Sequence, residues 1–239
     1  GLSSDIAAAV HRTISRFVLR AKVKVWDATG SLALLGAAGP KAESALRGVF
    51  PDPPGMPFEV SRRHGPVTSV RLGDGRFVLA SAPATASELR QRLGSMLQVT
   101  GPRAWRWLDI RNGLPWITAA TQDRLVPQMA NFELIGGVSF DKGCYTGQEV
   151  VARTQHLGKV KRRMFLANVA APAVAGDELY SEDLGDQASG VVVNAEASPD
   201  GGCDMLAVVQ SSSRESSPVR LKSLAGPALR FLPLPYPIA

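Results

Sequence analysis

The stretch from residue 160 to the end of the chain limits the fold more than any other part of the sequence. It consists of short apolar segments separated by turn-forming residues, and each segment has the length of a strand rather than of a helix. The segments are KRRMFLANVA, DELYS, ASGVVVNAEAS, CDMLAVVQ, PVRLKS and ALRFLPL, and the turn sequence SPDGG at 198–202 predicts a hairpin. The pattern predicts a small C-terminal β-barrel or sandwich, which we assign to residues 159–239.

Residues 22–99 have a mixed pattern that predicts a separate α+β module. The clearest part is a hairpin over 67–81, in which Asp74 and Gly75 supply the turn between two alternating strands. The full expected order is strand 22–27, strand 32–36, helix 40–50, hairpin 67–81 and helix 84–97. This order is a β-β-α-β-β-α unit of ferredoxin-like type.

Two segments of the chain predict helices but no sheet of their own. Residues 5–20 predict an amphipathic helix, and a second helix is expected to begin after Pro102. A long irregular stretch follows at 114–146, and long ordered loops in compact domains are usually functional. We therefore expect residues 1–21 to be the remnant of a first module that begins before this chain, and residues 100–158 to be the segment that returns to it.

Composition narrows the class of protein. Of the 239 residues, 45% are apolar and 20% are charged, as in ordinary globular proteins, and no apolar run is long enough to span a membrane. Two cysteines and three histidines are too few for a disulfide framework and argue against a metal site, which favours a reducing, cytoplasmic location. The net charge of +6 favours anionic partners such as nucleic acid or polyglutamylated ligands, or reflects only a solvated basic surface.

The sequence DKGCYTGQEVVAR places a cysteine just before a predicted helix. Thr146 and Glu149 fit a capping box at the start of that helix. Cys144 lies two residues before the cap, where the helix amides and Lys142 would stabilise a thiolate. The competing interpretation is a small buried side chain in a tight loop. His156 is near the far end of the helix, so a Cys/His hydrolase is not expected.

Aromatic and basic residues lie on either side of this motif. Trp105 and Trp107 are two positions apart on a helix and face different ways, so one is expected in the core and the other is a candidate stacking platform for a pterin. The alternative is that both are ordinary core or surface aromatics. In GKVKRR, a strand would place Lys161 and Arg163 on one face and Arg162 on the other, either to hold phosphates or a polyglutamate tail, or as a solvated strand end.

The segment VPQMANFELIGGVSFDKGCYTGQEVVAR closely resembles the signature of the YgfZ family, whose hallmark is K-G-C-[FY]-x-G-Q-E. That family is related to the folate-binding aminomethyltransferase of the glycine-cleavage system. The segments RFVLRAKVKVWDAT and WRWLDIRNGLPWI and the ending LRFLPLPYPI also resemble the family. The resemblance implies an aminomethyltransferase-like folate-binding fold, in which two ferredoxin-like α/β modules and a C-terminal β-barrel surround a tetrahydrofolate site.

The resemblance also implies a function. Family members support the assembly or repair of iron–sulfur clusters, including those of enzymes that thiolate tRNA. The implied partners are folate, iron–sulfur enzymes or assembly proteins, and tRNA or tRNA-modifying enzymes, with no membrane. Cys144 and Lys142 are the residues then expected to carry the chemistry. The residues expected to bind tetrahydrofolate are Trp105, Gln128, Asn131, Tyr145, Gln148, Lys161 and Arg162.

Two departures from the family pattern and two competing functions stay open. The part of the family fold that precedes residue 1 is expected to carry another folate-facing segment. Arg111 stands where the family often has glutamate, and a cation there would weaken a hydrogen bond to the pterin amino group, so we do not assign it to the site.

The competing functions are an aminomethyltransferase, which leaves the K-G-C motif unexplained, and an RNA-binding module without a folate role. Whether the chain is an enzyme or an accessory protein is left open.

Overall fold

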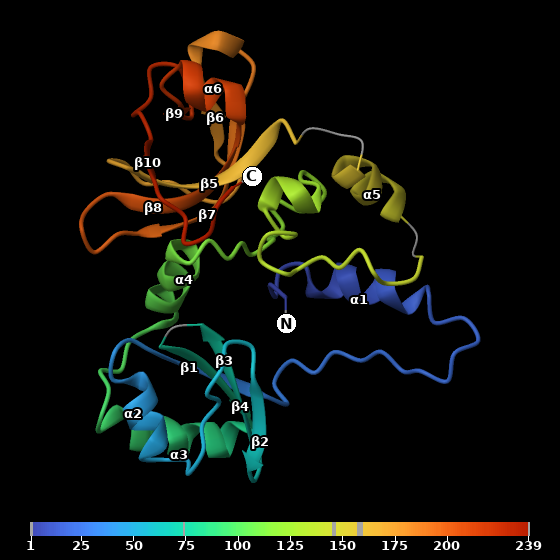
Figure 1. Cartoon of the computed structure of the whole chain (residues 1–239), viewed down its shortest axis with the longest axis vertical. Helices are drawn as coiled ribbons and strands as arrows, with labels where there is room; N and C mark the ends of the chain where they lie inside the picture. Colours follow the sequence, from blue (N-terminus) through green and yellow to red (C-terminus); the bar gives the residue numbers. More distant parts are fainter. Residues whose placement is uncertain (1, 74, 145–146, 157–159, 239) are drawn as a thin grey trace. The chain divides into compact units, whose positions relative to one another are not determined.

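The computed structural model describes residues 2–73, 75–144, 147–156 and 160–238, which form two compact units (Figure 1). One unit comprises residues 14–101, and the other combines residues 1–13 with residues 102–239. Each unit contains an antiparallel sheet with its own hydrophobic core. The predicted α+β class is confirmed.

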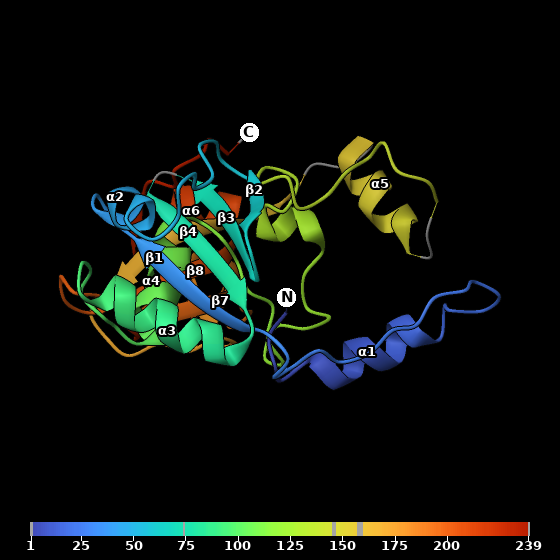
Figure 2. The same cartoon turned by 90° about the horizontal axis from the view of Figure 1, so that it is seen from below.

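The unit of residues 14–101 is a four-stranded sheet with two helices. Its elements in chain order are β1 (Ala33–Ala38), α2 (Ala42–Arg47), β2 (Val60–His64), β3 (Val67–Gly73), β4 (Arg76–Ser81) and α3 (Pro83–Gly94). The strands are ordered β1-β4-β3-β2, and each neighbouring pair is antiparallel. The two helices and the sheet can be followed in Figure 2.

Alternating side chains on β4 build the core of this unit. Phe77 and Leu79 are 0% and 1% exposed, and they share one buried cluster with Leu46 of α2 and with Leu89 and Leu93 of α3. Burying each such side chain stabilises the fold by about 1.5–3 kcal/mol. The strands and helices form here because their apolar faces cover one another.

The predicted hairpin over 67–81 is confirmed by the pairing of β3 with β4. Gly75 has a φ of +63°, which suits the left-handed position of a hairpin turn. Asp74, the other predicted turn residue, lies outside the described residues. The predicted helices at 40–50 and 84–97 are present as the shorter α2 and α3.

One predicted strand is wrong, and one strand was missed. Residues 22–27 form no strand, and Trp26 is 74% exposed. Their alternating side chains predict a half-buried strand, but strand formation depends on a neighbouring strand, and residues 22–27 belong to neither sheet of the described chain. The fourth strand is instead β2, whose sequence VSRRH lacks apolar alternation and which pairs with β3. The order is therefore β-α-β-β-β-α rather than β-β-α-β-β-α.

The second unit is built on a six-stranded antiparallel sheet that curls into a half-barrel. Its strands are β5 (Arg162–Val169), β6 (Glu178–Tyr180), β7 (Gly190–Ala197), β8 (Cys203–Gln210), β9 (Arg220–Leu221) and β10 (Arg230–Leu232), with the short helices η2 (Glu182–Leu184) and α6 (Ser211–Ser216) between them. The order is β10-β5-β8-β7-β6-β9. Each of the predicted strand segments contains one of these strands, and the SPDGG turn joins β7 to β8.

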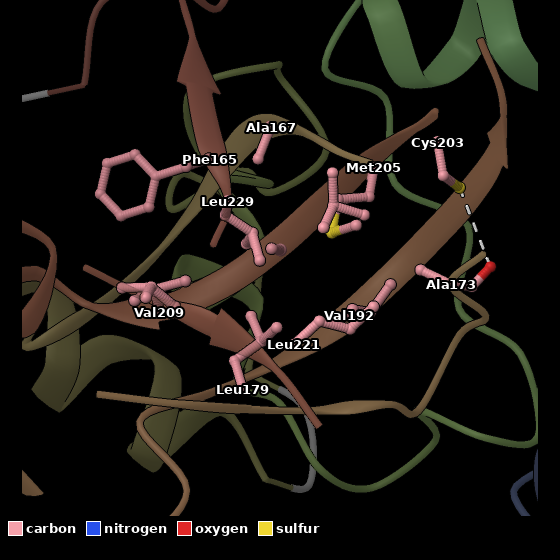
Figure 3. Close-up of a cluster of buried hydrophobic side chains, with 13 residues drawn as sticks. Phe165, Ala167, Ala173, Leu179, Val192, Cys203, Met205, Val209, Leu221 and Leu229 are labelled. Carbon is pink, nitrogen blue, oxygen red and sulfur yellow. Dashed lines mark hydrogen bonds between the residues drawn. The ribbon is translucent and has the colours of Figure 1, made fainter. Parts of the chain in front are cut away.

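The strand β8 shows why this sheet needs a continuous apolar sequence. Every residue from 203 to 209 is buried, and alternate side chains fill two different cores. Cys203 and Met205 belong to the cluster drawn in Figure 3. Leu206 and Val208 belong to the other cluster, which Ile110 completes. Such a run is typical of a strand that is covered on both faces.

Four further helices are α1 (Ala7–Ser15), α4 (Pro102–Arg111), η1 (Pro127–Ala130) and α5 (Gln148–His156). The helix predicted after Pro102 is confirmed as α4, and proline suits its first turn because the missing N–H has no partner there in any helix. The predicted helix over 5–20 is shorter than expected, because α1 ends at Ser15 and Phe17 beyond it is 63% exposed. No helix in the described part of the chain is long and apolar enough to cross a membrane.

Candidate functional site

Two buried amide side chains lie at the centre of the candidate site, on and just after η1. Gln128 and Asn131 are both 0% exposed. The Gln128 Nε2 donates to the backbone carbonyl oxygen of Val151 in α5 at 2.7 Å. The Asn131 Nδ2 donates to the carbonyl oxygen of Met164 in β5 at 2.8 Å. The structure therefore brings together two of the residues predicted to bind folate, and each ties the loop to a different element.

The chemistry of these two bonds fixes which amide atoms remain available. A backbone carbonyl only accepts hydrogen bonds, so the atom facing it must be the amide nitrogen. The oxygens Oε1 of Gln128 and Oδ1 of Asn131 are buried and have no partner among the described residues. Buried polar atoms in native proteins nearly always have a partner, so these oxygens suit a ligand or water that offers N–H or O–H donors.

A buried ion pair holds the same loop against the half-barrel. Arg163 of β5 pairs with Glu133, and both side chains are largely buried, at 12% and 8% exposed. The Nη1 of Arg163 also donates to the backbone carbonyl oxygen of Gln128 at 2.9 Å. Arg163 thus braces the loop, whereas Lys161, which a strand was predicted to place on the same face, is exposed. The second carboxylate oxygen of Glu133 is a further buried acceptor without a partner in the described region.

The C-terminal tail closes over this region through Tyr236. Its hydroxyl donates to the backbone carbonyl oxygen of Gly113, just past the end of α4, at 2.8 Å. Burial raises the pKa of Tyr236, and a hydrogen bond with the Asn131 side chain opposes that rise. Tyr236 therefore joins the tail, the end of α4 and the buried loop.

Cys144 and Lys142 lie on the surface, ahead of α5. Cys144 is an exposed free thiol, so the interpretation of a small buried cysteine in a tight loop is wrong. The buried cysteine is Cys203, in the half-barrel. No hydrogen bond or ion pair between described residues joins Cys144 or Lys142 to Gln128 or Asn131.

The helix predicted after Cys144 is present as α5, but its cap cannot be described. Thr146, the predicted N-cap, and Tyr145, a predicted folate residue, both lie outside the described residues. Gln148 begins the helix and is half-buried. His156 ends it, where its ring meets Phe140 edge to face with 6.1 Å between the ring centres. At 1.5 Å per residue, the two ends of α5 lie about 12 Å apart.

The tryptophans near α4 have different surroundings. Trp107 donates its Nε1 to Asp204 in β8 at 2.8 Å, and Trp116 donates to Asp109 at 3.0 Å, so both have structural partners. Trp105 is half-buried and, two positions from Trp107, lies on another side of the helix. Arg111 pairs with Asp204, with 3.7 Å between Nη1 and Oδ2, so this cation serves to attach α4 to the half-barrel.

A second carboxylate of the half-barrel, that of Glu196 in β7, also anchors α4. Arg103 and Arg106 donate to the two oxygens of Glu196 in β7, at 3.0 and 2.7 Å. Burial works against the charge on Glu196, but the hydrogen bonds from Arg106 and Arg103 lower its pKa below the usual range. The helix that carries Trp105 is therefore fixed on the half-barrel.

Two of the predicted cationic residues lie at the start of β5: Lys161 precedes the strand, and Arg162 is its first residue. Lys161 and Arg162 are both exposed, and one Arg162 guanidinium nitrogen lies 3.4 Å from the carbonyl oxygen of Ala188. Both remain accessible to an anionic group. Among the described residues, no cluster of three or more histidine, cysteine or acidic side chains could hold a metal ion.

Two residues of the site, Glu133 and Tyr236, escaped the sequence analysis, and Arg163 was considered there only as part of a cationic strand end. Each acts through a contact with a residue distant in sequence, and Tyr236 reaches across 123 positions to Gly113. The sequence offers one signal for the ion pair. Glu133 follows the segment PQMAN, and its charge is opposite to that of the two arginines in KRRMF.

Comparison with solved structures defines the class of fold. Over 96% of this chain and 66% of the other, the structure matches the glycine cleavage system aminomethyltransferase T from Bartonella henselae, with a TM-score of 0.65 and 19% sequence identity. The chain therefore has an aminomethyltransferase-like fold. No family model matches the chain.

Sequence relatives identify the chain more closely. It is 36% identical over 211 residues to the tRNA-modifying protein YgfZ of Sodalis glossinidius (strain morsitans), and 33% identical over 210 residues to that of Yersinia pestis (strain Pestoides F). Each match covers 86% of this chain and 64% of the relative, so the chain spans somewhat less than two thirds of the length of these relatives. The chain is homologous to the YgfZ proteins, and the resemblance predicted from its sequence is confirmed.

Proposed function

We propose that this chain is a cytoplasmic folate-binding protein that supports iron–sulfur cluster assembly or repair and so affects tRNA modification. The observation that carries the proposal is the pair of buried amide oxygens, on Gln128 and Asn131, that have no partner among the described residues. Its relatives are named for tRNA modification, and its fold is shared with an aminomethyltransferase.

The residues of the loop fit the chemistry of a folate. The pyrimidine edge of a pterin carries N–H donors, which match the acceptor oxygens of Gln128 and Asn131. The half-buried Trp105 offers an aromatic face for the ring system. Lys161 and Arg162 are exposed cations suited to the glutamate tail. Tetrahydrofolate, when bound, supplies a carrier for one-carbon groups.

The exposed thiol of Cys144 is the residue to which we assign the iron–sulfur role. An exposed cysteine is accessible to metal ions and to reactive sulfur compounds, and cysteine sulfur is a common ligand of iron–sulfur clusters. Lys142, two residues away and also exposed, is the second residue to which we assign this role. Gln148, which begins α5, and Tyr145, which lies outside the described residues, complete the proposed set of folate-binding residues.

The test uses the two cysteines of the chain as a matched pair. In bacteria that lack their own copy of this protein, the chain and its variants would be expressed, and thiolated nucleosides in tRNA measured by mass spectrometry. We expect Cys144→Ala to abolish the restored modification and Cys203→Ala to preserve it, because Cys203 is buried in the half-barrel. Full restoration by Cys144→Ala would rule out the thiol.

Aminomethyl transfer is the second candidate function. One specific observation favours it: Glu133 supplies a buried carboxylate oxygen without a partner in the described region, and this chemistry needs a carboxylate near the folate. The ion pair with Arg163 already engages the other oxygen of that carboxylate. Formation of methylenetetrahydrofolate from an aminomethylated lipoyl carrier would favour this activity over the accessory role.

A further inference from the structure

Gln128 connects the proposed folate site to α5, the helix that follows Cys144. Its Nε2 holds α5 through the carbonyl oxygen of Val151, at 2.7 Å. Its Oε1, on the same amide group, is buried and has no partner among the described residues. A ligand that donates a hydrogen bond to Oε1 would therefore be linked to α5 through the single amide group of Gln128.

The helix α5 is attached to its unit in part through Val151 and through η1. Val151 is its buried residue, and the neighbouring Val150 is 56% exposed. The helix packs on η1, which carries Gln128. The edge-to-face contact of Phe140 with His156 joins the helix only to its own preceding loop. The bond from Gln128 to Val151 is thus one attachment of the helix that follows Cys144.

We propose that Gln128 is a positioning residue that couples occupancy of the folate site to the setting of Cys144. Hydrogen bonds in a chain polarise one another, so a donor on Oε1 strengthens the bond that Nε2 makes to Val151. The ligand then holds α5, the helix that follows Cys144 in the sequence, more firmly. This inference rests on the proposed folate site and adds to it a route to the thiol.

Asn131 supplies a matched control for this route. It is the other buried amide of the loop, and its oxygen is equally without a partner in the described region. Its nitrogen, however, holds Met164 of β5 rather than α5. Loss of Asn131 should therefore weaken ligand binding without cutting the link to Cys144. Glycine is a suitable replacement because Asn131 has a φ of +58°.

The experiment measures alkylation of Cys144 by iodoacetamide, with and without saturating tetrahydrofolate, in the whole chain. We expect the ligand to slow alkylation up to about twofold in the wild type, because polarisation strengthens a hydrogen bond by about 10–30%. In Gln128→Met the rate should be the same with and without ligand at saturation, whereas Asn131→Gly should behave like the wild type once saturated. If the ligand slows the reaction equally in Gln128→Met, it merely covers the thiol and the coupling is disproved.

A second measurement needs no variant at Gln128. Hydrogen exchange of the wild-type α5 amides should slow when tetrahydrofolate binds, by the same factor of up to about two. Binding without any change in α5 exchange or in alkylation would overturn the coupling and leave the proposed folate site intact. Failure of the wild type to bind tetrahydrofolate would overturn the folate site itself, and the coupling with it.

Discussion

Tyr236 donates its phenolic hydrogen to the backbone carbonyl oxygen of Gly113, across 2.8 Å of space and 123 positions of sequence. The ring also lies against the Gly113 backbone so closely that a Cβ there would be 2.6 Å from a ring carbon. This contact joins the last residues of the chain to the end of α4. The Asn131 side chain also opposes the rise in the pKa of Tyr236 that burial causes, so the tail lies beside the candidate site.

Removing the Tyr236 hydroxyl should therefore lower the stability of this unit. Tyr236→Phe keeps the ring but leaves the buried carbonyl of Gly113 without its donor, at a cost of about 1–3 kcal/mol in the free energy of unfolding. Urea unfolding followed by tryptophan fluorescence would measure the loss, since Trp105, Trp107 and Trp116 all belong to this unit.

Tyr180 provides the control for that measurement. Its hydroxyl donates to the exposed carboxylate of Glu178 at 2.8 Å, where water can replace the bond. Tyr180→Phe should change the free energy of unfolding by less than about 0.5 kcal/mol. Equal losses in the two variants would contradict the role given to Tyr236.

The ion pair between Arg163 and Glu133 makes a second prediction. Both side chains are largely buried, so Arg163→Met leaves a buried carboxylate without its partner and should cost about 3–5 kcal/mol of unfolding free energy. The double variant Arg163→Met/Glu133→Leu should lose less, because no uncompensated charge remains.

An exposed pair sets the scale for the buried one. Arg47 and Glu43 are 2.8 Å apart, but their side chains are 65% and 36% exposed. Arg47→Met should therefore lower stability by less than about 1 kcal/mol. If Arg163→Met/Glu133→Leu is as unstable as Arg163→Met, the loss of stability comes from packing rather than from the buried charge.

Cys203 makes the half-barrel sensitive to alkaline pH. Burial raises the pKa of its thiol above the usual 9.0, and the nearby carboxylate of Asp204 adds to the rise. The unfolded chain therefore ionises this thiol at a lower pH than the folded chain does. The stabilisation is complete below pH 9 and is lost as the pH rises through the folded pKa.

The matched variant for this prediction is Cys203→Ala. We expect the free energy of unfolding to fall more steeply above pH 9 in the wild type than in the variant, because only the wild type has a thiol to ionise. Comparing slopes removes the constant loss from the missing sulfur atom. Parallel pH curves would contradict the assigned role of the thiol.

The sequence predicted local structure well where the apolar pattern was strong. The strands after residue 160 are present because their alternating or continuous apolar side chains suit a sheet covered on both faces, as β8 shows. The strand expected at 22–27 is absent, since alternation alone does not supply a pairing neighbour. The strand β2 was missed because the sequence VSRRH carries little apolar signal.

The site was predictable only in part. The family resemblance selected Gln128 and Asn131, but it did not predict that both would be fully buried or which amide atom each would leave free. Those properties depend on Val151 and Met164, which are distant in sequence. Hydrogen bonds between distant residues leave no periodic pattern, so local reasoning does not find them.

The most direct test of the central claim is a calorimetric titration of this chain with tetrahydrofolate. The matched variant is Asn131→Gly, with circular dichroism to establish that it folds. We predict saturable one-to-one binding by the wild type. The affinity of Asn131→Gly for tetrahydrofolate should be at least about tenfold lower, because the ligand donor loses its acceptor. No binding by the wild type, or equal affinity in a folded Asn131→Gly, would contradict the assignment of these buried amides to a folate site.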